Sequence, residues 1–240
     1  MHPILAQGCH RVSGFPTCDP RVATGQAEDY PPFTCQASKD DPVRADATAN
    51  RLRLLDATVD LVLEVGGEPS RDAIAARTGV GIGTVYRHFP DRQSLLHAVA
   101  RHVLERTITA GEAIVADSAG DTGAADGIGA IRQYMHAALD HGIGAVNMIH
   151  PLLDDSDWPD LTTRAEALMR ELVGLGRADD RLGVDIDVGD IVFATIRLGR
   201  PLAIGLPPDE DRVIAHRQLD RYVDGWLLGP HTRTQEEPAA

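Results

Sequence analysis

Hydrogen-bonding and basic side chains are concentrated in one short stretch of the chain, residues 77–92, which has the sequence RTGVGIGTVYRHFPDR. Thr84, Tyr86, Arg87 and His88 place hydroxyl, guanidinium and imidazole groups close together. Such groups are the ones that proteins direct at the phosphate oxygens and base edges of DNA. The stretch therefore indicates a nucleic-acid-binding surface, although the whole chain carries a formal net charge of -13.

A second group of polar side chains has the types that hold a metal ion or transfer protons. His136, Asp140 and His141 lie close in sequence, and positions i and i+4 share one face of a helix. The acidic run DDSDWPD, residues 154–160, clusters further carboxylates. No third ligand or nucleophile motif accompanies either group, so a helix surface and a solvated loop are the simpler interpretation. We expect no catalytic residue, metal or cofactor.

Nothing in the sequence predicts export or a membrane span. The N-terminus, MHPILAQGCHRVSGFP, has no charged run leading into an apolar segment. No stretch approaches the roughly 18 apolar residues of a membrane-crossing helix. The three cysteines, Cys9, Cys18 and Cys35, have spacings that match no zinc site, which predicts free thiols. These features predict a soluble, cytoplasmic protein.

Helical periodicity dominates the chain beyond its first 46 residues. Apolar residues recur at helical spacing and runs of β-branched residues are few, which predicts an all-α fold. The helices expected in the second half span about 126–141, 143–152, 160–178, 187–205 and 210–228. We expect four parts: a disordered N-terminal extension (1–46), a three-helix DNA-binding domain (47–107), a larger helical domain (108–229) and a tail (230–240).

Local signals divide the 47–107 segment into short helices. Ser70 is suited to cap a helix over residues 71–78, and Gly79 supplies the left-handed residue that ends it. A further helix extends to about Phe89, and Asp91 is suited to cap a long helix after it. Two helices joined by a tight turn, the second of them lying in the major groove, form a helix-turn-helix.

The string IAARTGVGIGTVYRHFPDRQSLLHAV resembles the DNA-binding domain of TetR-family repressors, whose pattern is close to I-A-x-x-x-G-V-S-x-G-T-x-Y-x-H-F-x-x-K-x-x-L. The resemblance covers about residues 48–108. It implies that the Thr84 hydroxyl reaches DNA and that Tyr86 contacts a backbone phosphate and often a base. It also implies that His88 contacts phosphate.

Two arginines and one aromatic residue complete the implied roles. Arg87 occupies a variable position from which a side chain can reach a base edge or a phosphate. Arg92 replaces the usual lysine near the start of the fourth helix, which faces the DNA backbone in the family. Phe89 matches the aromatic residue that closes the core of the domain.

The stretch departs from the family pattern at the start of the recognition helix. Gly81 stands where Ser or Thr is preferred, so a side-chain N-cap and a hydroxyl for phosphate are both lost. Ile82 stands where a basic residue is frequent, which removes one phosphate contact but offers an apolar contact to a thymine methyl group. Gly83 follows the family and lets the backbone approach DNA.

The acidity of the chain lies mostly outside this domain. Residues 47–107 have eight arginines and seven acidic residues, a net charge of +1, whereas residues 108–240 have a net charge of -12. DNA binding must therefore depend on a local cluster of basic side chains and helix N-termini. The candidate DNA-binding residues are Arg51, Arg53, Arg71, Gly81, Ile82, Gly83, Thr84, Tyr86, Arg87, His88 and Arg92.

The resemblance implies that the larger domain dimerises and binds a small molecule. Its last third predicts two amphipathic helices joined by a Pro-Pro turn, which suit a four-helix bundle with a symmetry mate. This arrangement resembles the SbtR-like branch of the family. Methionine and aromatic residues at helical spacing belong to the core more often than to a pocket. With that alternative open, the candidate ligand-binding residues are Tyr134, Met135, Met148, His150, Trp158, Met169, Phe193 and Arg197, of which the last could instead pair with an acid.

The sequence thus predicts a homodimeric transcription regulator, a repressor that binds a palindromic operator in double-stranded DNA and is released by an unknown small-molecule effector. One alternative is an enzyme or small-molecule carrier with a vestigial helix-turn-helix. A second alternative is a regulator without an effector, which a largely packed C-terminal core would support.

Ile82 should weaken the salt dependence of DNA binding. Each basic side chain that neutralises a phosphate of duplex DNA steepens the slope of log K against log salt by about 0.9. We therefore expect a slope shallower by about that amount than in a relative that has lysine or arginine at this position. Binding titrations at several salt concentrations measure the slope, and an equally steep one would contradict the prediction.

Overall fold

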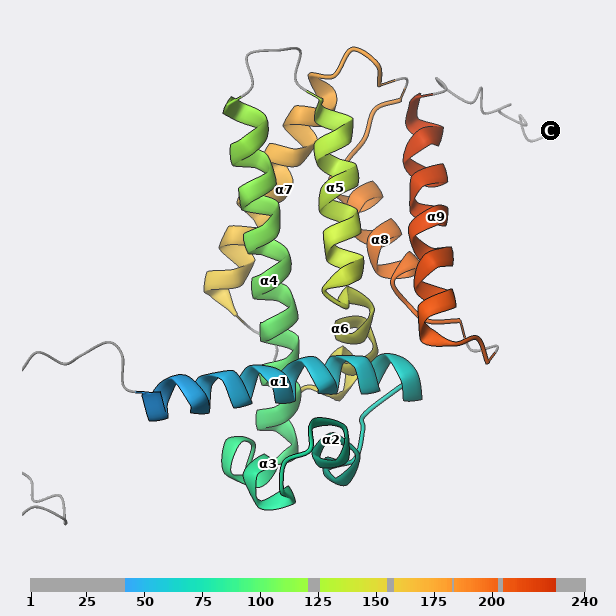
Figure 1. Cartoon of the computed structure of the whole chain (residues 1–240). Coiled ribbons are helices and arrows are strands. Elements are labelled where there is room, and N and C mark those ends of the chain that lie inside the picture. The colour runs from blue at the N-terminus through green and yellow to red at the C-terminus, as the bar shows by residue number, and fades with distance from the viewer. Residues whose placement is uncertain (1–41, 121–125, 155–157, 183, 203–204, 228–240) are drawn as a thin grey trace, which may run out of the picture. The chain divides into compact units, whose positions relative to one another are not determined.

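The computed structural model describes residues 42–120, 126–154, 158–182, 184–202 and 205–227, and the regular structure in these ranges is all helical (Figure 1). The expected all-α class is therefore confirmed. The elements are α1 (Pro42–Val65), α2 (Arg71–Thr78), α3 (Ile82–His88), α4 (Arg92–Gly120), α5 (Gly127–Asp140), α6 (Ile143–Ile149), the 3₁₀ turn η1 (His150–Leu152), α7 (Pro159–Arg177), α8 (Val188–Leu198) and α9 (Pro208–Leu227). No helix within the described ranges is long and apolar enough to cross a membrane.

Local sequence signals determine the ends of the short N-terminal helices. The hydroxyl of Ser70 accepts a hydrogen bond from the backbone N–H of Ala73 at 3.1 Å, which caps α2. Gly79 follows α2 in the left-handed conformation, with φ 72°. A carboxylate oxygen of Asp91 accepts from the backbone N–H of Ser94 at 2.7 Å at the start of α4. These three signals were all visible in the sequence.

Some expected boundaries differ in the structure. α1 begins at Pro42 rather than near residue 47. α4 continues to Gly120 without a break at the expected domain boundary between residues 107 and 108. α8 ends at Leu198 rather than near residue 205. Pro201 lies just beyond this end, and proline disfavours helix at its own position and at the preceding one. The expected extension up to residue 41 and the tail over 230–240 lie outside the described residues.

The first core joins α1, α2, α3 and the start of α4, which gather at the lower end of Figure 1. Leu54, Ile74, Val85 and Leu96, one from each helix, are buried together. α6 adds Ile149 to the same cluster. This packing holds the short α3 in place, since a helix of two turns is not stable by itself.

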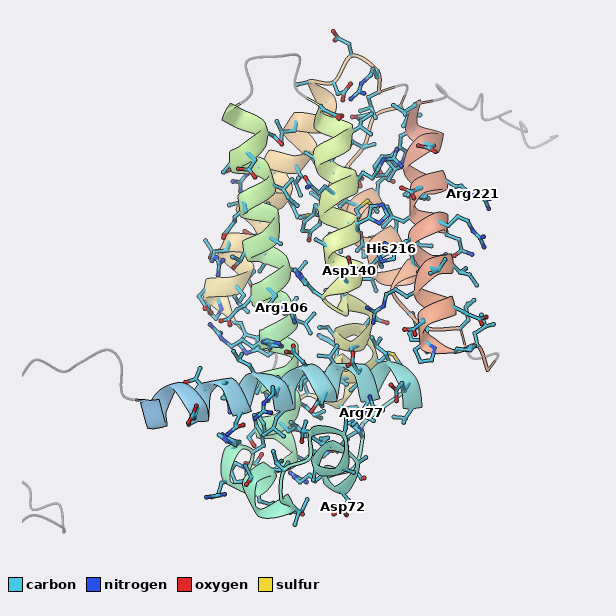
Figure 2. The ribbon with its side chains drawn as sticks, in the orientation of Figure 1. Asp72, Arg77, Arg106, Asp140, His216 and Arg221 are labelled. Atoms are coloured by element: carbon cyan, nitrogen blue, oxygen red, sulfur yellow. The ribbon has the colours of Figure 1, made fainter. Side chains whose placement is uncertain are left out.

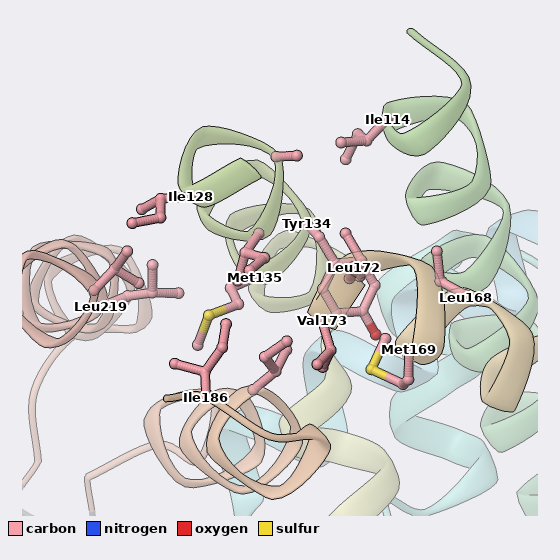
Figure 3. Close-up of a cluster of buried hydrophobic side chains, with 14 of the residues drawn as sticks. Ile114, Ile128, Tyr134, Met135, Leu168, Met169, Leu172, Val173, Ile186 and Leu219 are labelled. Carbon is pink, nitrogen blue, oxygen red and sulfur yellow. The ribbon is translucent and has the colours of Figure 1, made fainter. Parts of the chain in front are cut away.

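The second core lies between α4, α5, α7, α8 and α9 (Figure 3). Ile114, Met135, Leu172 and Leu219 come from four of these helices and are buried in it. Tyr134 is also buried here, and its burial raises the pKa of its hydroxyl to about 12. The core is made mainly of aliphatic and methionine side chains, as the low aromatic content of 4% requires.

α4 contributes to both cores. Leu96 and Val99 are buried in the first core, and Ile108 and Ile114 in the second. The 29 residues of this helix span about 44 Å at 1.5 Å per residue. α4 is therefore a continuous link between the helix-turn-helix and the C-terminal helices.

Candidate nucleic-acid interface

α3 is buried on one side and open to solvent on the other. Val85 and Phe89 anchor it in the first core, whereas Tyr86 is 49% exposed and Ile82 is 39% exposed. Gly81 precedes the helix in an extended conformation and provides no side-chain cap, as expected. Apart from the adjoining residues and the helix's own backbone, no atom of the described residues lies within 4 Å of the position that a Cβ would take at Gly81 or Gly83. The start of α3 therefore presents a smooth backbone surface to the solvent.

Thr84 and Arg87 form one polar unit on the exposed side of α3. Nη2 of Arg87 donates to Oγ1 of Thr84 at 2.8 Å, and Nε of Arg87 donates to the carbonyl oxygen of Gly83 at 3.4 Å. Because the Thr84 oxygen accepts this hydrogen bond, its own hydrogen is directed elsewhere and can be donated. The pair thus offers both a guanidinium and a hydroxyl donor to an anion.

Arg71 of α2 lies over the ring of Tyr86. The centre of its guanidinium is 5.0 Å from the ring centroid, which is within the range of a cation–π contact. The Nε atom of Arg71 is buried and has no hydrogen-bond partner among the described residues. The contact fixes the tyrosine ring, a role for Arg71 that the sequence pattern did not predict.

Arg51 supports the far end of α3. Its guanidinium lies 4.6 Å from the centroid of the buried Phe89 ring, and Nη1 donates to the carbonyl oxygen of His88 at 3.4 Å. Arg53, on the same helix, is exposed and donates to the side chain of Asn50 one turn earlier. α1 therefore brings two of the expected arginines, one against α3 and one to the solvent.

Other arginines of this region are paired with carboxylates. Nε of Arg92 is 2.6 Å from Glu68, so the basic group expected to face the DNA backbone is already compensated. Arg77 of α2, which is labelled in Figure 2, pairs with Glu64 of α1, and this ion pair lowers the pKa of the Glu64 carboxyl. Arg106 of α4 is 2.9 Å from Asp56 of α1. By contrast, Arg71 and Arg87 contact uncharged partners.

A cavity of about 1000 Å³ opens between α4, α6, α7 and the start of α8. Three of the eight expected ligand-binding residues line it: His150, Trp158 and Met169. Leu104, Ile108 and Val173 add apolar walls, and Trp158 also makes an edge-on ring contact with His97. The sequence did not single out the charged side chains of its lining, which are Glu166, Arg170, Arg177 and Asp187.

The other five expected ligand-binding residues lie elsewhere. Tyr134 and Met135 are buried in the second core, and Met148 packs against the first core. Phe193 is 72% exposed and Arg197 is exposed, both on α8, so neither lines the cavity. A helical repeat shows that a residue is on an apolar face, but it does not show whether that face meets a cavity, a packed core or another protein.

Within the described residues, no group of three or more His, Cys, Asp or Glu side chains could hold a metal ion. Asp154 and Asp160 flank the undescribed part of the acidic run, and Asp160 forms an ion pair with Arg101. The pairing lowers the pKa of Asp160. Cys9, Cys18 and Cys35 lie outside the described residues.

Comparison with known proteins agrees with the helix-turn-helix geometry. Residues 54–99 match the model of a family described as bacterial regulatory proteins, tetR family. The crystal structure of a TetR transcription regulatory protein from Mycobacterium vanbaalenii superposes with a TM-score of 0.52 and 28% identity, over 78% of this chain and 100% of that one. The DNA-binding segment of this chain, residues 54–99, is of the TetR type.

Two further matches extend the comparison. An HTH-type transcriptional regulator of Staphylococcus aureus (strain USA300) is 40% identical over 68 residues, which are 28% of this chain and only 37% of that protein. The structure of the TetR-like regulator LfrR from Mycobacterium smegmatis, in complex with proflavine, superposes with a TM-score of 0.51 and 24% identity over 73% of this chain and 96% of that one. The sequence similarity to the Staphylococcus relative is thus confined to a part of each chain.

Substitution of Arg71 by glutamine should destabilise the protein modestly. The change removes the guanidinium from the face of Tyr86, and a cation–π contact at an exposed site contributes about 0.5–1 kcal/mol. We expect the free energy of unfolding in urea to fall by about that amount.

Arg53→Gln is the matched control, because it removes the same charge from an exposed side chain of the same domain. We expect it to change the free energy of unfolding by less than about 0.5 kcal/mol. Equal effects of the two substitutions would show that the contact between Arg71 and Tyr86 contributes nothing.

Proposed function

We propose that this TetR-family chain is a transcription regulator that binds a specific sequence of double-stranded DNA through α3. The observation that carries the proposal is the solvent-facing side of α3, where Arg87 donates to Thr84 and Tyr86 is exposed, on a helix anchored by Val85 and Phe89. The major groove of DNA, about 12 Å wide, accepts one α-helix, and recognition helices contact base edges with their N-terminal residues.

Each exposed group has a chemical role in this proposal. The Thr84 hydroxyl and the Arg87 guanidinium donate hydrogen bonds to phosphate or base acceptors, and Ile82 contacts a thymine methyl group. Arg71 orients the ring of Tyr86 and contributes positive charge near it. We assign contacts with the DNA backbone, or support of α3, to the remaining candidates, which are Arg51, Arg53, Gly81, Gly83, His88 and Arg92.

The α8–α9 surface supports a homodimer. Large apolar side chains are exposed there, including Phe193 at 72% and Val213 at 64%. Exposed apolar patches mark interaction sites, and two antiparallel helices from each subunit form a four-helix bundle. A two-fold dimer doubles the DNA contacts and suits a palindromic operator, whose half-sites follow the symmetry of the protein.

The 1000 Å³ cavity supports an effector rather than a fully packed regulator. Its volume is at the upper end of the usual range for ligand pockets, about 300–1000 Å³, and Trp158 and Met169 make part of its wall apolar. A ligand that binds better to one of two conformations shifts the population toward it. We propose that the effector favours a conformation that releases DNA, so that the protein acts as a repressor in the cytoplasm.

The rival function is an enzyme or small-molecule carrier that does not use its helix-turn-helix. An enzyme or carrier would use the same cavity, but it would show no preference for any DNA sequence. Selection of binding sites from a pool of random duplex DNA separates the two, because only a regulator enriches a common sequence.

Arg87→Gln should weaken binding to the selected DNA. Loss of a base contact reduces the binding free energy by about 1–3 kcal/mol and relaxes the sequence preference, whereas loss of a phosphate contact lowers the salt slope by about 1. Fluorescence anisotropy with labelled DNA at several salt concentrations measures both quantities.

Arg164→Gln is the control for net charge. Arg164 is a surface arginine of α7 that pairs with Glu112, and Glu112 lies on α4 about 30 Å along the helix from Arg92. We expect its DNA affinity to equal that of the native chain. An Arg87 variant that also binds like the native chain would remove α3 from the proposed interface.

Phe193→Glu should convert the proposed dimer into monomers. The substitution places a charge in the apolar surface of α8 that the partner would cover, and burial of an unpaired charge is strongly unfavourable. Light scattering coupled to size-exclusion chromatography gives the mass. Val65→Glu changes an apolar residue of α1 that is also exposed and should leave the dimer intact; a native chain that is already monomeric would contradict the proposal.

A further inference from the structure

Two imidazole rings meet between α5 and α9, away from the cavity and from α3. His136 of α5 and His216 of α9 place their Nδ1 atoms 2.6 Å apart, and the ring planes are inclined by only 16°. Nitrogen atoms at this distance are closer than the faces of two stacked rings can approach. The rings therefore meet edge to edge, with the two nitrogens directed at each other.

Each ring is also bound to a carboxylate of the opposite helix. Nε2 of His136 is 3.0 Å from Oδ1 of Asp220, and Nε2 of His216 is 3.0 Å from Oδ1 of Asp140 (Figure 2). Each helix thus presents a histidine and, four residues later, an aspartate to the other. An ionised carboxylate can only accept hydrogen bonds, so each Nε2 atom carries a hydrogen and donates it.

These two hydrogens determine what can lie between the Nδ1 atoms. A neutral imidazole has one N–H group, and here that group is already used at Nε2 in both rings. Without a further proton, two lone pairs would face each other at 2.6 Å. With one further proton, the Nδ1–H of one ring donates to the Nδ1 of the other in a charge-assisted hydrogen bond. We propose that His136 and His216 share one proton and so form a pH-sensitive clamp between α5 and α9.

The surrounding charges favour one bound proton. Asp140 and Asp220 bind the two rings, and Arg132 of α5 is 3.0 Å from Asp220 and 2.6 Å from Asp224 of α9. Hydrogen bonds from His136 and Arg132 lower the pKa of Asp220, which keeps this carboxylate ionised. Asp140 and Asp220 contact the two rings directly, and Arg132 offsets one of these two negative charges, so the immediate surroundings suit a single added positive charge.

The other helices that pack against α5 and α9 bring few titratable groups to the pair. α8 contributes the buried Ile191, while its Asp187 and Asp190 lie near Tyr222 instead. α7 contributes buried apolar side chains such as Leu172. At the end of α5, burial and the charge of Arg106 on α4 lower the pKa of His141, so this neighbour favours its neutral form.

The clamp holds the half of α9 that lies next to α1. Arg212 lies one turn before His216 on α9. Burial raises the pKa of Asp60 on α1, and the positive charge of Arg212 acts on that pKa in the opposite direction. Asp60, Asp140 and Arg212 line a cavity of about 690 Å³ at this junction. Loss of the shared proton would therefore loosen α9 beside the first helix of the DNA-binding region.

The stabilisation of the folded chain by the clamp should pass through a maximum as the pH is varied. The unfolded chain has no shared proton, so the clamp stabilises the folded chain only where the pair holds one proton. As the pH rises, the bridging proton leaves and the stabilisation is lost. As the pH falls, both rings become protonated and two Nδ1–H groups face each other, so the stabilisation is lost again. By contrast, a histidine that contacts only one carboxylate makes a contribution to stability that changes with pH in one direction only.

A double-mutant cycle measured across pH tests the clamp. The native chain, His136→Gln, His216→Gln and the double variant are unfolded in urea at intervals between pH 5 and pH 9 in the presence of a chelator. The coupling between the two residues should reach about tenfold in the unfolding equilibrium constant at its maximum and decline toward both ends. A coupling that is absent, or that does not vary with pH, would overturn the proposal.

His102→Gln serves as the control, because Nε2 of His102 contacts a carboxylate oxygen of Asp56 at 2.8 Å and not the nitrogen of another imidazole. Its effect on stability should vary with pH in one direction only. Nuclear magnetic resonance of ¹⁵N-histidine gives a second measurement, in which His136 and His216 should titrate together through a common intermediate. Independent titration would contradict a shared proton. Stabilisation by added zinc that both single variants abolish would assign the pair to a metal ion and likewise overturn the clamp.

Discussion

Burial of one continuous helix in two cores constrains the rest of this structure. Leu96 and Val99 of α4 pack with α1, α2 and α3, whereas Ile108 and Ile114 pack with α5 and α7. Well-packed interiors respond to displacement as connected units, since close-packed side chains transmit strain. A movement of α4 at one core must therefore be accommodated at the other. The cavity wall includes Leu104 and Ile108 of the same helix, so an occupant of the cavity touches this link directly.

The distribution of arginines explains how an acidic chain can present a basic surface. Arg92, Arg77 and Arg106 are paired with carboxylates of the N-terminal region, and surface pairs of this kind contribute little to stability. Arg71 and Arg87 instead contact an aromatic ring and a hydroxyl, and they keep their charge available beside α3. The net charge of -13 therefore says little about the field near α3.

The α5–α9 contact illustrates a different use of polar groups. Most of the second core is apolar and specifies only that helices pack together. The histidine and aspartate pairs at its edge require particular hydrogen positions as well, so they specify one register of α9 on α5. Partly buried polar networks have this property because a shift by one turn leaves donors and acceptors unmatched. The same property makes the contact sensitive to protonation, whereas the leucine and isoleucine contacts are not.

The sequence by itself determined the features that depend on near neighbours. Ser70, Gly79 and Asp91 mark helix ends through bonds and backbone angles within a few residues, and the string typical of the family located α3. Periodicity also identified most C-terminal helices to within a few residues, although it missed the early start of α1. These features were predictable because their causes lie within one or two helical turns.

Only the tertiary structure decided which face of each helix meets what. It placed Trp158 at a cavity, Met135 in a packed core and Phe193 at the surface, although the sequence offers all three alike as candidate ligand-binding residues. It also brought together His136 and His216, which are 80 residues apart in the chain. The sequence suggests only a solvated helix face for His136, because the partner that gives it a role belongs to another helix. Contacts over such distances depend on how whole helices pack, and no local pattern of residues contains that information.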